Sequence, residues 1–158
     1  MTAPPPAPRT ASRPGHDDPP ALQAALRARG IAGDDEAIGD DARRDAFAAF
    51  LYGMALVFVG REDTTDDTPL AERVDLLATT LVRRVIGLAF RDACRAVEAV
   101  ADALVASEPD PAVVGLVHGG AAAAGDWIDG DAGAFESHVL EATASDAFAS
   151  ERALRARR

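Results

Sequence analysis

The sequence contains no lysine and a single cysteine, and it has no arginine between Arg95 and Arg152. Because Cys94 stands alone, an intramolecular disulfide is excluded, and a lone thiol fits a reducing cytosol. The uncharged stretch 46–60 is shorter than the roughly 20 apolar residues that cross a bilayer. Residues 1–20 are rich in proline and lack the apolar core of a secretory signal. These absences predict a soluble, cytoplasmic protein that does not enter a membrane.

Acidic residues outnumber basic ones, 26 to 16, which gives a formal net charge of −10. They form two blocks. In residues 34–72 eleven carboxylates face three arginines, and in residues 96–151 eleven carboxylates face only His118 and His138. Such a field repels nucleic acid and anionic lipid and attracts a basic partner. The alternative is that the acidity keeps the chain soluble, or reflects the bias toward Ala, Arg and Asp that is common in GC-rich genomes.

Helical periodicity dominates the chain, and no segment shows the alternation of a β-strand. Residues 1–18 contain five prolines and no periodic apolar residues, so we expect a disordered tail. Residues 19–158 are expected to form one all-α domain, a bundle of about six helices. The helix that follows Asp40 and Asp41 is apolar on nearly every side over 46–60, which predicts that it lies at the centre of the bundle.

Capping signals mark the later helices. Thr68-Pro69 begins a segment whose two apolar stripes are offset by one residue near Gly87, which predicts either a kink or two consecutive helices. Asp110 and Pro111 then suit the start of a helix. Gly130 suits its left-handed end, and Asp131 caps a last helix that is expected to reach Phe148.

The acidic turn 126–136 is the strongest candidate binding site. It comprises Asp126, Trp127, Asp129, Asp131 and Glu136. A calcium loop is excluded, because the twelfth position counted from Asp129 is Leu140 where such a loop needs glutamate. Either the turn is structural, with Trp127 packed on Phe135, or it is a patch that binds a partner's Arg or Lys around an aromatic anchor.

Other candidate sites are weaker. Neither His118 nor His138 belongs to a metal-ligand motif. Cys94 lies on the apolar stripe of Phe90 and Val97, where a buried apolar role is ordinary, and a catalytic role would need a partner histidine that the sequence cannot place. Gly115 and Gly119 begin a small-residue surface that predicts either close approach of another helix or a break at Gly119-Gly120. A phosphate-binding loop is excluded because its lysine is missing. We therefore expect no catalytic residue, metal or cofactor.

The turn Trp127-x-x-Gly130-Asp131-x-x-x-Phe135, together with the acidity and the helical pattern, resembles the small all-helical immunity proteins of bacterial polymorphic toxins. This resemblance covers about half of the chain. It implies a protein that binds and neutralises a toxin without catalysis. A helical regulator or small-ligand binder with a pocket between helices remains the alternative, suggested by the Gly/Ala-rich surface and the irregularity at Gly87. An enzyme of unfamiliar type has only isolated carboxylates in its favour.

Overall fold

The computed structural model describes residues 24–26, 41–62 and 67–144. Their main helices are α2 (Asp41–Arg61), α3 (Leu70–Ile86), α4 (Phe90–Val105), α5 (Pro111–Asp129) and α6 (Ala132–Ala144). Residues 24–26 are helical too, and the described ranges contain no strand, so the predicted all-α bundle is confirmed. No helix within these ranges is long and apolar enough to span a membrane. The predicted tail 1–18 and the expected extension to Phe148 lie outside the described residues.

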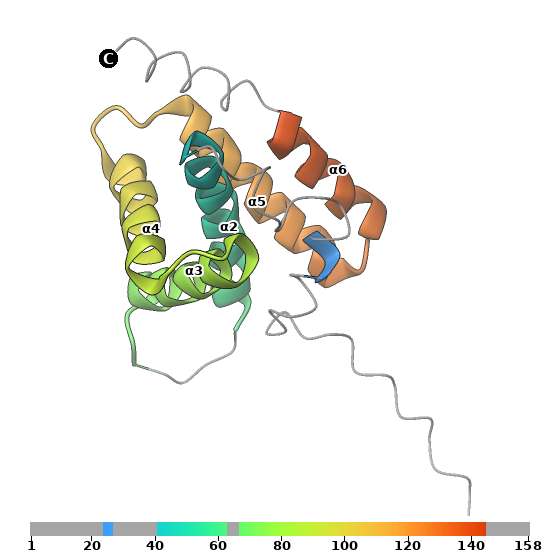
Figure 1. Ribbon diagram of the computed structural model, residues 1–158. Helices are drawn as coiled ribbons and strands as arrows, with labels where there is room; N and C mark the ends of the chain where they lie inside the picture. Colours follow the sequence, from blue (N-terminus) through green and yellow to red (C-terminus); the bar gives the residue numbers. More distant parts are fainter. Residues whose placement is uncertain (1–23, 27–40, 63–66, 145–158) are drawn as a thin grey trace, which may run out of the picture.

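Helix α2 is the centre of the bundle, as its apolar sequence predicts. It packs mainly against α5 and α3 and also touches α4 (Figure 1). Phe47, Phe50, Met54 and Phe58 are all buried along it. Because α2 packs against neighbouring helices on several sides, apolar residues are needed on more than one face of it. This explains why its apolar residues are not confined to one stripe.

The irregularity at Gly87 separates two helices. Gly87 adopts the left-handed conformation, with φ of 82°, and its N–H donates to the carbonyl oxygen of Arg83 at 3.0 Å. Glycine takes this conformation without the steric penalty of a Cβ atom, so α3 ends here and α4 begins at Phe90. The two apolar stripes extend beyond the core. Leu70, the first residue of the stripe on α3, is 57% exposed, and Phe90, which belongs to the stripe on α4, is 58% exposed.

Glycine also sets the contact between α2 and α5. A Cβ atom added to Gly120 would lie 1.8 Å from the carbonyl oxygen of Phe50, and one added to Gly53 would lie 1.9 Å from that of Val117. The predicted close approach of a neighbouring helix is therefore present, centred on Gly120. The alternative of a break at Gly119-Gly120 is wrong, because α5 continues through both residues.

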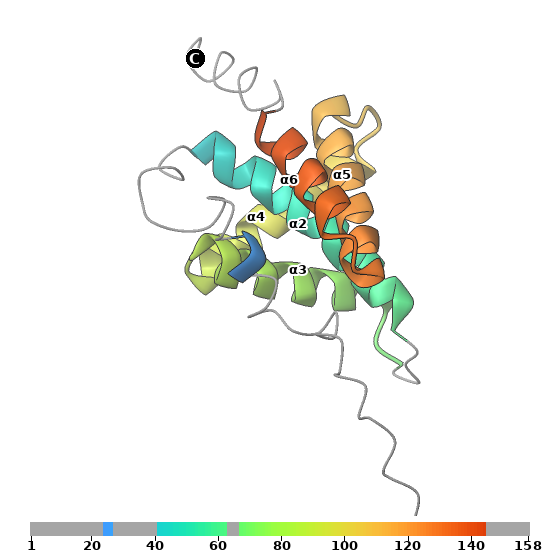
Figure 2. The ribbon, with the colours of Figure 1, turned by 90° about the vertical axis from the view of Figure 1, so that its right-hand side faces the viewer.

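Helices α5 and α6 form a hairpin on one side of the bundle, and they lie side by side in both views (Figures 1 and 2). From α6, Phe135, Val139 and Ala142 are buried. This hairpin carries all five candidate site residues, so its connecting turn positions the predicted site.

Candidate functional site

The turn between α5 and α6 is built by Gly130 and Asp131, as the sequence predicts. Gly130 has φ of 77°, and its N–H donates to the carbonyl oxygen of Trp127 at 3.2 Å. The N–H of Asp131 donates to the carbonyl oxygen of Asp126 at 2.9 Å, which closes the helix end. Asp131 then caps α6, because its Oδ1 accepts the N–H of Ala134 at 2.9 Å.

Trp127 packs across this turn. Its ring centroid lies 5.1 Å from that of Phe135, with an angle of 51° between the ring planes. Phe135 is buried, whereas Trp127 is only partly buried against the core. The contact confirms the predicted packing and gives Trp127 a structural role. Part of the indole remains accessible to solvent.

Asp126 faces the neighbouring helix more than the solvent. Its Oδ2 is buried and lies 3.1 Å from Nε2 of His138 on α6, with both side chains about one third exposed or less. This distance suits an ion pair when the imidazole is protonated. The oxygen lies beside the imidazole but accepts no well-aligned hydrogen bond from the described residues. Asp126 therefore lies against α6 and is not a fully solvated position near the end of α5.

The remaining candidate carboxylates are more open. Asp129 and Asp131 are exposed beside the turn, and Glu136 is half-buried in the second turn of α6. Asp126, Trp127 and Asp131 make contacts within the hairpin, whereas the side chain of Asp129 makes no ion pair or hydrogen bond with a described residue.

The α5–α6 hairpin lacks arginine, whereas α3 and α4 carry acidic and basic side chains together. In the described ranges, α5, α6 and their turn contain Asp126, Asp129, Asp131, Glu136 and Glu141 but no arginine. The arginines from 73 to 95 belong to α3 and α4, and Arg73 forms an ion pair with Glu62. Within the part of the chain that the structure describes, the hairpin therefore carries five carboxylates and no arginine to offset them.

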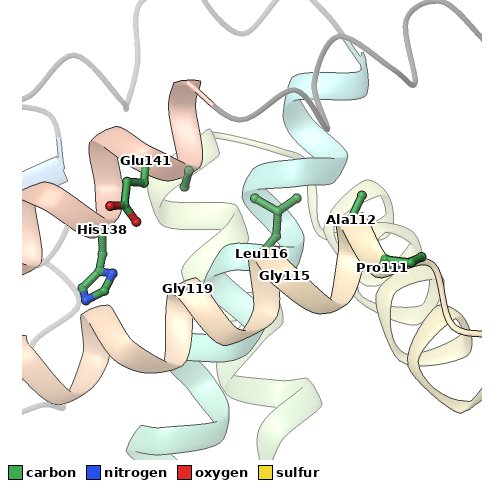
Figure 3. A pocket seen from close by; sticks show the side chains of 8 residues that line it. Pro111, Ala112, Gly115, Leu116, Gly119, His138 and Glu141 are labelled. Carbon is green, nitrogen blue, oxygen red and sulfur yellow. The ribbon is translucent and has the colours of Figure 1, made fainter.

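A groove lies between α5 and α6, and its lining includes His138, the residue beside Asp126. It has a volume of about 350 Å³ and is lined by small or apolar residues and two ionisable groups (Figure 3), among them Gly115, Leu116, Gly119, His138, Glu141 and Ala142. Sequence reasoning singled out the two glycines for helix packing and missed Glu141. The helical spacing could have identified Glu141, because positions 138, 141 and 142 lie on one side of a helix.

Metal and thiol chemistry gain no support. Within the described residues no three His, Cys, Asp or Glu side chains are grouped so that they could hold a metal ion. Cys94 is half-buried on α4 and forms no disulfide. Comparison of the chain with protein-family models, with curated proteins and with solved structures finds no match.

Proposed function

We propose that this protein is a binding module whose α5–α6 hairpin engages a basic protein partner. The observation that carries the proposal is the charge of the hairpin: five carboxylates, no arginine and no lysine between Pro111 and Ala144. Complementary charge accelerates encounter and selects among partners. Asp129 and Glu141 supply exposed charge, and Trp127 supplies a partly accessible aromatic surface of the kind that anchors interfaces.

A toxin that the module neutralises by covering its active cleft is the partner that we favour, in the manner of the helical immunity proteins that the sequence resembles. In this proposal the module acts in the cytoplasm, by binding alone, with no reaction or cofactor of its own. Nucleic acid is disfavoured as a partner because phosphates are repelled by the carboxylates of the hairpin.

The proposal is tested by capturing partners from the source cell on the immobilised full chain and measuring their association rates against salt. A basic partner whose association slows as salt rises supports the proposal, whereas an acidic partner, or a rate that salt does not change, contradicts it. The neighbouring gene gives an independent check. A large secreted protein with a variable C-terminal domain favours toxin neutralisation.

The second candidate, a small-ligand binder, is favoured by the groove between α5 and α6. Its volume of about 350 Å³ lies near the lower end of the range of ligand pockets, about 300–1,000 Å³. A metabolic operon around the gene, together with a small molecule that stays bound during purification, would favour this candidate over the first.

A further inference from the structure

Gly115 of α5 lines the groove between α5 and α6, and the packing of the helix bundle does not require glycine at this position. A Cβ atom added at Gly115 would meet nothing within 4 Å, whereas one added at Gly120 would collide with the Phe50 carbonyl. Within a helix, glycine costs about 1 kcal/mol relative to alanine. The α2–α5 contact does not need glycine at position 115, because an added Cβ atom would meet no neighbouring atom. The absence of a side chain here instead leaves room in the groove that Gly115 lines.

The walls of the groove combine apolar surface with one carboxylate. Leu116 on α5 and Glu141 on α6 both line the groove; Leu116 is 7% exposed, and Glu141 extends from α6 toward α5 (Figure 3). Glu141 is exposed and makes no ion pair with another described residue. The other ionisable group, His138, has its Nε2 beside Asp126. A guest in the groove thus meets apolar atoms and a single available negative charge.

This combination suits a cation on an aliphatic stem. Arginine and lysine lay their methylene groups on apolar surfaces while their charged ends reach polar groups. Arginine is the better match, because its guanidinium is weakly hydrated and pairs with a carboxylate through two parallel hydrogen bonds. An acidic guest would be repelled by Glu141 and would find no arginine on either helix.

We infer that the groove is the docking point for an arginine of the basic partner, flanked by an apolar residue. The aliphatic stem and the apolar neighbour would contact Leu116 and Ala142, and the guanidinium would pair with Glu141. This inference rests on the proposed function. It adds a defined contact point to a surface otherwise described only by its charge.

The test uses a synthetic 14-residue helical peptide with leucine and arginine four positions apart, titrated into the isotopically labelled full chain and followed by NMR. We expect the amide signals of Gly115, Gly119 and Ala142 to shift. Two matched peptides replace the arginine with glutamate or the leucine with alanine, and each should bind at least about fivefold more weakly. Butylguanidinium, titrated in parallel, shows whether a free small cation suffices. If butylguanidinium binds as strongly as the arginine peptide, the inference that a protein segment occupies the groove is wrong.

Two variants locate the binding. Gly115→Leu places a side chain in the groove and should weaken peptide binding by about tenfold or more. A Cβ atom at this position meets nothing within 4 Å, and circular dichroism checks that the variant keeps the parent fold. The matched control is Gly60→Leu, also at an open helical glycine but outside the groove lining, and it should bind as the parent does. Glu141→Arg, at an exposed position, should abolish binding of the arginine peptide without relying on packing.

Failure of the inference differs from failure of the proposed function. Wild-type affinity in both Gly115→Leu and Glu141→Arg, or no binding of the arginine peptide, overturns the groove as docking point. The proposed function would then survive if a basic natural partner still associates in a salt-dependent manner. An acidic natural partner would overturn the proposed function and the partner assignment together, even if the peptide occupied the groove.

Discussion

Gly120 of α5 faces the carbonyl oxygen of Phe50 on α2 so closely that a methyl group on Gly120 would lie 1.8 Å from that oxygen. The obstacle is backbone, which cannot rotate away as a flexible side chain can. The spacing of the two most extensively packed helices therefore depends on the absence of one side chain. Gly53 plays the reciprocal part against Val117.

Gly120→Ala should consequently destabilise the protein by about 3 kcal/mol or more, because overpacking forces α2 and α5 apart. The control is Gly115→Ala on the same helix, where the added methyl group meets open space. It should raise the free energy of unfolding by up to about 1 kcal/mol through helix propensity. Urea denaturation of both variants measures the difference, and similar effects at the two positions would contradict the described contact.

Two phenylalanines that both follow helical stripes should differ sharply in their contribution to stability. Phe50 is 2% exposed, and Phe50→Ala should cost about 3–5 kcal/mol. Phe90 is 58% exposed beneath the guanidinium of Arg83, at 5.5 Å from the ring centroid, so Phe90→Ala should cost no more than about 1 kcal/mol. Thermal unfolding monitored by circular dichroism compares them. A near-neutral Phe50→Ala would show that α2 is not the core.

Local signals in the sequence predicted local structure well. The helix break at Gly87, the left-handed Gly130, the cap at Asp131 and the contact of Trp127 with Phe135 each depend on residues within one turn or hairpin. Their geometry is fixed by backbone sterics and short-range hydrogen bonds, which the order of residues specifies directly. The central position of α2 was also predictable, since an all-round apolar helix has no side left for solvent.

The relationships between helices were harder to predict. Helix α5 is rich in Gly and Ala, so its sequence gives little indication of which side faces α2, and Gly120 could not be distinguished from Gly115. The approach of Asp126 to His138 joins two helices and depends on how they pack. Phe90 continues an apolar stripe beyond the core, and periodicity alone does not show where a core ends.

The hydroxyl of Tyr52 should make stability sensitive to alkaline pH. Burial, and then the nearby Asp75 carboxylate at 3.5 Å, raises the pKa of Tyr52 above its ordinary value of about 10. The folded state therefore holds this proton more tightly than the unfolded state does. The resulting contribution to stability is complete below about pH 10 and is lost as the pH rises through the folded-state pKa.

Tyr52→Phe should thus flatten part of the decline in stability above about pH 10. Denaturant midpoints of both proteins across this range give the comparison. Because the chain has one tyrosine, tyrosinate absorbance reports the titration without ambiguity. Parallel declines in the stability of the two proteins would show that the hydroxyl is not held as described. A Tyr52 hydroxyl that titrates at the ordinary pKa of about 10 would show the same.

Two aspartates one helical turn apart should respond differently to charge reversal. Asp126→Arg places a cation where a buried oxygen now lies beside His138, so it should destabilise the fold by about 2 kcal/mol or more. Asp129→Arg, at an exposed position, should change stability by no more than about 0.5 kcal/mol. Chemical denaturation of the two variants measures the contrast. Equal losses would mean that Asp129 also has a structural role.

Because Asp129→Arg is expected to keep the fold intact, it should isolate the electrostatic part of partner binding. Exposed charges act mainly by steering encounter, so the variant should slow association more than it accelerates dissociation. The effect should fade as the Debye length shrinks from about 10 Å at 0.1 M salt to about 3 Å at 1 M. Stopped-flow association with the captured partner, in a salt series, provides both rates.

The control for this measurement is Glu72→Arg, which makes the same change in net charge at an exposed position on α3. If the α5–α6 hairpin is the binding surface, Glu72→Arg should slow association much less than Asp129→Arg does, since a steering charge acts most strongly within about one Debye length of the approaching partner. Equal slowing by both variants would mean that only the total charge matters. The acidity of the hairpin would then serve solubility and not recognition.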